Sequence, residues 1–479
     1  MNKRIVAQIL SRVVILEAVL LLIPLFTALY YKETFSEYIY TIIIAAALAL
    51  VLWFFKPESN VVYAREGLVS AGLSWIIISA IGALPFVFSK QLPTFADAFF
   101  ETVSGFTTTG SSVFKNPELV NKALLLWRSI TQWIGGMGVL VFIMAVTPLA
   151  EQSSMHIMRA EVPGPKFGKL APKMRTSSAI SYLIYIALTV ILIALLLAGG
   201  MSFFDSINHA FATAATGGFS VKALSIGQYN NLYFEIVLGI FMLLFATNFS
   251  FFFLILARKF KNAFKISEVW VFYIIVVFAV ITISFDIQSM YGGFFGGLRH
   301  AFFQVSSLIS TTGFSSTDFA LWPSYSRLVL LAVMLIGACA SSTGGGIKVI
   351  RLMVLVKASL LESLKALSPR STVKVKVGGE VVDKQGLYLT FVYFFIYMTV
   401  TGLATIAVSL NGFDIESSFS AAVTCISNVG PGLAKFGPME NFMALSGLTK
   451  IILSMTMLIG RLEIFPIFII FMPETWRKT

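Results

Sequence analysis

The chain has 479 residues, of which 57% are hydrophobic, 14% aromatic and only 12% charged. Soluble domains carry about 25% charged residues, so this composition excludes an ordinary soluble protein and predicts an all-α polytopic membrane protein. The formal net charge of +12 could indicate a nucleic-acid partner, but no basic cluster is interleaved with stacking aromatic residues, so we expect none.

Two apolar runs, residues 13–30 and 38–55, open the chain. The first follows a charged start, as in a signal peptide, but it is too long and lacks a small-residue cleavage site. We therefore expect a retained N-terminal pair of transmembrane helices in residues 1–66.

After this pair the chain repeats one plan four times: an apolar span, a shorter half-span that ends in a Thr/Asn/Gly signature, and a second span. The half-spans are well short of the ~20 residues needed to cross a bilayer, so we expect them to dip into the membrane and return. We assign pore repeats 1 to 4 to residues 67–150, 151–258, 259–370 and 371–479. The predicted spans are 68–88 and 123–149, 178–199 and 232–257, 268–285 and 327–361, and 386–410 and 448–472, with half-spans 94–106, 203–215, 298–309 and 415–426.

The four signatures follow one another about 100 residues apart, which indicates an internal repeat. A glycine-bearing extended loop at membrane depth is tolerated only where it is buried in protein or lines water. Four such loops around one axis predict a ring of backbone carbonyls that replaces the hydration shell of a cation, although a single Thr-Gly pair would indicate only a turn. The signatures are 106–110 (FTTTG), 215–220 (ATGGFS), 310–315 (STTGFS) and 427–432 (SNVGPG).

Acidic residues stand near the expected start of three half-spans: Asp97, Asp205, and the pair Asp414 and Glu416. There they can cap free N–H groups and complement the positive end of the helix dipole, which leaves the negative end facing the signature and favours a cation. His300 stands at the equivalent place in the third repeat. Ordinary polar capping at a membrane surface is the alternative interpretation.

The spans predict an even total of ten crossings, so both termini should lie on one side of the membrane. The Lys- and Arg-rich segments between spans, including residues 150–177 and 348–384, all fall on that side. The positive-inside rule makes it the cytoplasmic side. The signatures should therefore open to the outside.

A run of small residues, 337–346 (GACASSTGGG), lies inside the second span of the third repeat. Each Gly costs roughly 1 kcal/mol relative to Ala in a helix, so we expect the helix to break here. A break beneath the filter would obstruct the path and could move aside as a gate, whereas close helix packing is the alternative. Lys348 follows the run, either as a cation near the pore or as a positive-inside anchor.

Arg461 lies deep in the last span, where a charge costs about 2.5–3.5 kcal/mol. Such a residue should face water or a partner. Glu463 is a poor partner because residues two apart point to different sides of a helix. We expect Arg461 to face the inner cavity as an electrostatic barrier to cations, with a structural ion pair as the alternative.

The arrangement of span, half-span, signature and second span, in four non-identical copies, resembles that of the Trk/Ktr/HKT superfamily of potassium transport proteins over nearly the whole chain. The four signatures, the first extended to 101–110 (ETVSGFTTTG), resemble its filters, 342–348 (STGGGIK) its intramembrane gating loop, and 460–465 (GRLEIF) its last-helix arginine segment. The extra N-terminal helix pair is similar to the TrkH branch. The resemblance implies four repeats around one central pore, in a bacterial inner membrane.

The resemblance also implies which residues select and gate the ion. In plant relatives a serine in the first filter accompanies sodium preference, so Gly110 argues for K+. The departures from Thr at Gly217, Asn428 and Val429 predict looser discrimination against Na+. The implied filter residues are Thr108, Thr109, Gly110, Thr216, Gly217, Gly218, Thr311, Thr312, Gly313, Asn428, Val429 and Gly430, and the gate residues are Gly337, Ser341, Ser342, Thr343, Gly344, Gly345, Gly346, Lys348 and Arg461.

Two function classes compete: a gated potassium pore, and a secondary transporter that couples K+ to H+ or Na+. A proton relay normally needs a chain of intramembrane carboxylates or histidines. The acids Glu17, Glu101, Glu235 and Glu463 are scattered, which favours the pore. No nucleophile and base or metal-ligand motif accompanies the repeats, so we expect neither an enzyme nor an organic cofactor.

Partners follow from the resemblance, which implies a homodimer docked on a cytoplasmic TrkA-type ring that binds nucleotides in its own chains. The basic loops at 150–177 and 348–384 suit such docking or anionic lipid headgroups equally well.

Overall fold

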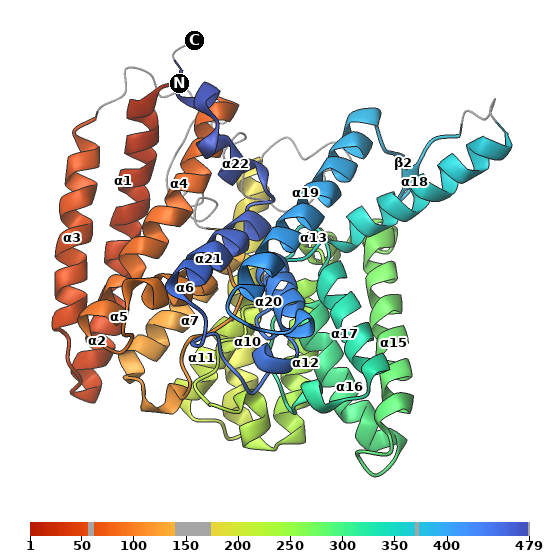
Figure 1. Cartoon of the computed structure of the whole chain (residues 1–479), viewed down its shortest axis with the longest axis horizontal. Coiled ribbons are helices and arrows are strands. Elements are labelled where there is room, and N and C mark those ends of the chain that lie inside the picture. Colours follow the sequence, from red (N-terminus) through yellow and green to blue (C-terminus); the bar gives the residue numbers. More distant parts are fainter. Residues whose placement is uncertain (56–61, 139–173, 369–372, 478–479) are drawn as a thin grey trace.

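The computed structural model describes residues 1–55, 62–138, 174–368 and 373–477, most of which lie in helices (Figure 1). Both termini lie at the same end of the bundle (Figure 1), as the even number of predicted crossings requires. Most of the predicted basic loop 150–177 lies outside the described residues.

The N-terminal pair of spans is present: α1 (Lys3–Leu20) and α2 (Leu22–Tyr31) together form the first span, and α3 (Ser36–Trp53) forms the second. The first helix pauses at Leu21, where Pro24 cannot donate the hydrogen bond that would continue the ladder. Helix α1 packs against α3 and α4 (Ala64–Gly82). Large apolar side chains such as Phe26 and Ile43 remain exposed, as expected of a lipid-facing surface.

Each repeat then has the predicted order of helix, short helix and helix. Repeat 1 contains α4 (Ala64–Gly82), α5 (Leu84–Phe88), α6 (Phe95–Phe106) and α7 (Lys122–Met137); repeat 2 contains α10 (Met174–Ala198), α11 (Phe203–Ala214), α12 (Leu232–Ala246), α13 (Phe249–Leu256) and α14 (Phe260–Ala263). Repeat 3 contains α15 (Ser267–Ile287), α16 (Phe294–Ile309), α17 (Ser324–Ile336) and α18 (Val349–Leu367); repeat 4 contains α19 (Lys384–Ser409), α20 (Ile415–Ser427), α21 (Gly447–Arg461) and α22 (Phe465–Phe471).

Smaller elements complete the chain. The antiparallel strands β1 (Lys376–Val377) and β2 (Glu380–Val381) pair with Lys376 opposite Val381, before the first helix of repeat 4. A 3₁₀ turn follows every signature, which adds to the internal symmetry of the four repeats. These turns are η1 (Pro117–Leu119), η2 (Ser225–Tyr229), η3 (Phe319–Leu321) and η4 (Ala434–Phe436), and η5 (Pro473–Trp476) lies near the C-terminus.

The second span is interrupted in repeats 2, 3 and 4; the break in repeat 3 was predicted, whereas those in repeats 2 and 4 correct the prediction of continuous spans. In repeat 1 the remainder of the predicted span, 139–149, lies outside the described residues. Within the described residues, six helices are long and apolar enough to cross a membrane, or seven if the bent pair α12 and α13 is one span. Helix α7 ends at Gly138 with φ 85°, α12 and α13 meet at 90°, α17 ends at Gly337 with φ 73°, and α21 and α22 are separated by Ile464 with φ 75°. Each break falls where the backbone leaves helical geometry.

The second helix of each repeat packs on the short helix of the next repeat, so the four repeats form a closed ring. Helix α7 contacts α11, α12 contacts α16, α17 contacts α20, and α21 returns to α6. A polar pair bridges every one of these contacts. The pairs are Ser129 with Asn208, Glu235 with Arg299, Arg327 with Glu416, and Lys450 with Asp97.

Candidate functional site

The four short helices, α6, α11, α16 and α20, end in one shared backbone motif. The residue two positions before each signature glycine has a left-handed backbone, with φ of 56° at Thr108, 55° at Thr216, 61° at Thr311 and 56° at Asn428. The next N–H bonds back to a carbonyl five residues earlier, which is a Schellman-type helix end. These bonds are Thr109 to Ser104 (2.8 Å), Gly217 to Ala212 (2.8 Å), Thr312 to Ser307 (2.8 Å) and Val429 to Thr424 (3.0 Å).

This repeated conformation is strained, because a left-handed conformation costs a residue other than Gly roughly 1–2 kcal/mol. Strained residues persist only where the surroundings fix them, and they concentrate at functional sites. The recurrence at four equivalent positions therefore points to the signatures as the functional centre.

The signature glycine of each repeat faces a carbonyl of the next repeat. A Cβ added to Gly110 would lie under 3.0 Å from the carbonyl oxygen of Gly217, and all four glycines have positive φ. Neither the conformation nor the space admits a side chain. The same overlap would occur between Gly218 and Thr312, between Gly313 and Val429, and between Gly430 and Thr109, which closes the circle.

The signatures also border a single cavity of about 310 Å³. All four glycines line it, with Ser111, Ser220, Ser315 and Pro431 from the segments that follow them. Backbone and hydroxyl oxygens are the ligands that hard alkali cations prefer. The glycines and serines that line this cavity offer carbonyl and hydroxyl oxygens to a cation. Among the described residues, no cluster of three or more His, Cys, Asp or Glu side chains could hold a metal ion.

Two implied filter residues have side-chain partners that make the ring asymmetric. The amide of Gln132 donates to the Gly217 carbonyl at 2.6 Å and accepts from Phe219 N at 3.2 Å. The amide of Asn428 donates to Thr109 Oγ1 at 2.9 Å and to the carbonyl of Met457 at 3.0 Å. The Gly217 carbonyl is therefore already engaged from behind, whereas Asn428 ties the fourth signature to the first.

The small-residue run forms a non-helical loop between α17 and α18, as its composition predicts. The loop lies directly against the third and fourth signatures. Gly345 N donates to Thr311 Oγ1 at 2.7 Å, and a Cβ on Gly345 would overlap the carbonyl of Ser427. A Cβ on Gly344 would likewise lie 2.7 Å from the Ser310 carbonyl.

The loop is held from the other side by Glu268, at the start of α15. Its Oε1 accepts from Ala340 N at 2.6 Å and from Ile350 N at 3.3 Å, and its Oε2 accepts from Asn248 at 3.2 Å. Cys339 N donates to the Ala246 carbonyl at 3.1 Å. The loop thus sits in the break between α12 and α13. Glu268 was not identified from the sequence as a site residue.

Lys348 is buried, with 1% of its surface exposed, and its ammonium donates to the carbonyls of Gly344 and Cys339. The ammonium is thus held inside the protein and not at its water-exposed surface. Ser342 and Thr343 of the same loop are also buried, whereas Ser341 is half-buried with φ 54°. The predicted gate residues of the loop therefore form one packed element.

Arg461 bonds to backbone carbonyls of two other repeats. It donates to Thr343 O at 2.7 Å in the loop, and to Gly135 O at 2.6 Å and Gly136 O at 2.7 Å at the end of α7. Glu463 does not pair with Arg461 but forms an ion pair with Arg351 at 2.6 Å. This agrees with the expectation that residues two apart on a helix point to different sides.

The predicted capping roles require correction. Thr94 and Ser202 are the N-caps of α6 and α11. Asp97 and Asp205 lie in the first turn, and their backbone N–H groups donate to the hydroxyls of Thr94 and Ser202. Helix α16 begins earlier than predicted, at Phe294, so His300 is within the helix and not at its start. In repeat 4, Asp414 does cap the helix. Thr94 and Ser202 stand three residues before Asp97 and Asp205, so the hydroxyls take the N-cap position and the carboxylates fall in the first turn.

A family model described as TrkH, cation transport protein, matches residues 32–292 and 296–478. The chain belongs to the TrkH family. The Trk system potassium uptake protein TrkH of Escherichia coli (strain K12) is 34% identical over the full length of both chains. TrkG of the same organism is 33% identical over 99% of each chain.

The crystal structure of the potassium transporter TrkH from Vibrio parahaemolyticus superposes with a TM-score of 0.89 at 30% identity, covering the whole of both chains. This similarity confirms the all-α polytopic membrane fold and the resemblance drawn from the sequence. The chain is a multi-pass membrane protein of this family.

Proposed function

We propose that this protein mediates potassium uptake through a gated, cation-selective pore, as the membrane subunit of a Trk-type system. The observation that carries the proposal is the closed circle in which each signature glycine abuts the carbonyl of the next signature. Full-length similarity to proteins named for potassium uptake supports K+ as the permeating ion.

In this proposal the filter consists of the carbonyls of the strained residue, two positions before each signature glycine, and of the residue that follows it. The carbonyls of Thr109, Thr312 and Val429 have no side-chain donor behind them among the described contacts, whereas Gln132 occupies that of Gly217. Three stronger ligands and one weaker one would replace the hydration shell less completely than four equal ones. The asymmetry supports the expectation of looser discrimination against Na+.

The loop 337–348 would act as the gate, because it lies against the third and fourth signatures and is tied to α21 through Arg461. Its contacts are hydrogen bonds between backbone groups and a few side chains, which can be exchanged without unfolding a helix. Arg461 would oppose cations while it holds the loop in place. Opening would require Arg461 to release Thr343.

The second candidate is a secondary transporter that couples K+ to H+ or Na+. Glu17 supports it, since this carboxyl is 2% exposed and its oxygens have no hydrogen-bond partner among the described residues. It lies against Gly82, beside Thr102 of the first short helix. A buried ionisable residue within the membrane is a candidate proton site.

Bilayer recording of the purified protein tests both candidates. A pore gives discrete ohmic openings whose reversal potential follows the K+ gradient alone. A coupled transporter gives flux without openings, and a reversal potential that also moves with the proton or sodium gradient. In the second case Glu17→Gln should abolish the proton-dependent part.

We further propose an inner-membrane location with cytoplasmic termini, a homodimer, and regulation by a cytoplasmic nucleotide-binding ring of the TrkA type. Helix α18 supports the docking role, because it projects from the same end of the bundle as the termini (Figure 1) and carries the exposed Lys357 and the half-buried Lys365. Anionic lipid headgroups would suit the same charges. Co-purification with a ring subunit, lost on replacing both lysines by Glu, would support docking.

A further inference from the structure

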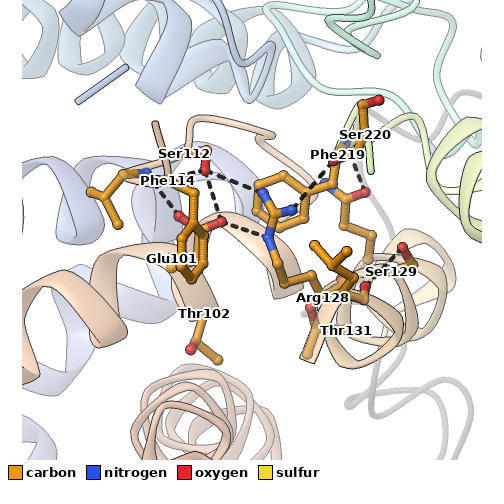
Figure 2. Close-up of polar contacts among 12 residues, drawn as sticks. Glu101, Thr102, Ser112, Phe114, Arg128, Ser129, Thr131, Phe219 and Ser220 are labelled. Atoms are coloured by element: carbon orange, nitrogen blue, oxygen red, sulfur yellow. Dashed lines mark hydrogen bonds and ion pairs between the residues drawn. The ribbon is translucent and has the colours of Figure 1, made fainter. Parts of the chain in front are cut away.

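We infer that Arg128 and Glu101 form a bracket that fixes the distance between the first and second filter segments, and that K+ selectivity depends on this bracket. The inference rests on the proposed pore function and adds a positioning role for two residues outside the signatures. Both are buried, with 3% and 0% of their side chains exposed, and their ion pair measures 2.8 Å (Figure 2).

Glu101 holds the segment that follows the first signature. Glu101 lies on α6, before the first signature, and its two carboxylate oxygens contact residues that follow Gly110. Oε2 accepts from Val113 N at 2.8 Å, and Oε1 accepts from Ser112 Oγ at 3.0 Å and from Arg128 Nε at 2.8 Å. The carboxylate therefore fixes both the backbone and a side chain of this segment.

Arg128 extends the contact to the second signature. From α7 it donates to Ser112 Oγ at 3.2 Å and to the carbonyl of Ser220 at 3.4 Å. Its guanidinium also lies over the ring of Phe219, 4.1 Å from the centroid (Figure 2). Ser112 and Ser220 each stand two residues after their signature glycine. One planar cation thus holds equivalent points of two filter segments.

The second and third repeats make a similar contact from the residue nine positions before their signature glycine, whereas the fourth repeat has Ala421 there. His209 occupies the same place before Gly218, and its Nε2 lies 3.0 Å from Ser220 Oγ. Gln304 occupies it before Gly313 and donates to Ser316 at 3.4 Å. In each of these repeats the short helix holds the segment after its own glycine. The first repeat alone has a carboxylate at this position. Through Arg128 this carboxylate is connected to the filter segment of the second repeat.

The geometry of the contacts explains the presence of a buried ion pair between Arg128 and Glu101 better than a gain in stability does. A buried ion pair contributes little net stability, because desolvation offsets the attraction, and an apolar pair of similar volume is often as stable. The guanidinium fork, however, can reach Glu101, Ser112 and Ser220 at once, which an ammonium on a flexible stem cannot. The ring pairs such as Glu235 with Arg299 bridge the helices, whereas this pair reaches the filter segments themselves.

The test measures the Na+/K+ permeability ratio of single purified channels under biionic conditions. Arg128→Lys keeps the charge and loses the fork. Ser112→Ala removes only the bridging hydroxyl. We expect Arg128→Lys to raise the ratio about tenfold, and Ser112→Ala to raise it by a smaller factor. Arg299→Lys is the matched control, an equally conservative change in an inter-repeat ion pair, and should leave the ratio unchanged.

The possible outcomes test the role of the bracket and the proposed pore function separately. A merely structural bracket would lower the yield of folded protein but leave the permeability ratio of the surviving channels at the wild-type value, which would overturn the inference. Because Ser112→Ala removes no charge, it keeps the test decisive even where Arg128→Lys fails to fold. Absence of any K+-selective current in the wild-type protein would instead overturn the proposed function.

Discussion

The guanidinium of Arg461 donates to the carbonyl of Thr343 at 2.7 Å and, through its other terminal nitrogen, to the carbonyls of Gly135 and Gly136. One side chain of the fourth repeat therefore connects the loop of the third repeat to the end of α7 in the first. Hydrogen bonds from a charged donor contribute about 1.5–3 kcal/mol each, so this connection favours a single position of the loop.

Replacing Arg461 with Ala should release the loop and remove the positive charge beneath the filter. Both effects favour cation passage, so we expect a higher open probability or single-channel conductance in bilayer recordings. Arg327→Ala is the control, since Arg327 is a partly exposed cation that pairs with Glu416 away from the loop. Currents of wild-type size and open time in the Arg461 variant would contradict both proposed roles of Arg461, which are to hold the loop in place and to oppose cations.

A side chain at Gly110 should disrupt ion selection. The residue has φ 84°, and its Cβ would overlap the carbonyl of Gly217, so Gly110→Ser must shift the main chain of two repeats. We expect the Na+/K+ permeability ratio to rise about tenfold or more, because displaced carbonyls no longer match the dehydrated ion. Gly402→Ala is the control, since a Cβ there meets nothing within 4 Å. A wild-type ratio in Gly110→Ser would remove Gly110 from the filter.

The sequence predicted the short helices closely because local signals define them. Helix α6 ends at Phe106 and α11 begins at Phe203, both as predicted, since each helix is apolar and stops at a Thr/Asn/Gly signature that cannot continue it. The break at Gly337 was predictable for the same reason, because small residues destabilise a helix locally.

The supporting residues could not be predicted because their partners lie far away in the sequence. Glu268 binds Ala340, 72 positions later, and Gln132 binds Gly217, 85 positions later. Neither residue type carries a spacing rule that would connect it to a signature. Likewise, the 90° bend after α12 follows no Gly or Pro signal, and it forms where the loop from the next repeat occupies the space. Tertiary packing decides these features.

Removing the carboxylate of Glu268 should loosen the loop from α15. In Glu268→Ala the N–H groups of Ala340 and Ile350 and the amide of Asn248 lose their shared acceptor. A buried donor without a partner costs about 1–3 kcal/mol, so the closed arrangement should be populated less and the open probability should rise. Glu268→Gln retains one acceptor oxygen and should fall between wild type and Ala. Equal open probabilities in all three proteins would show that Glu268 does not hold the gate.

The cap of the fourth short helix should make its stability depend on acid pH. Asp414 Oδ1 accepts from Ser417 N at 2.6 Å, and hydrogen bonds from Ser417 lower the pKa of Asp414 below its ordinary value of 3.8. A lowered pKa in the folded state means that the ionised cap stabilises the helix above the ordinary pKa, and that this contribution is lost as the pH falls through the folded one.

Asp414→Asn keeps an acceptor at the cap but cannot titrate, whereas Asp414→Ala removes the cap and should destabilise the helix by about 0.5–2 kcal/mol at neutral pH. Amide hydrogen exchange of the first turn of α20, followed from pH 7 down to about pH 3, measures the local effect. We expect the protection of wild type over Asn to shrink toward the acid end. A difference that stays constant with pH would show that the ionised form of Asp414 has no special role, and that any oxygen at this position starts the helix equally well.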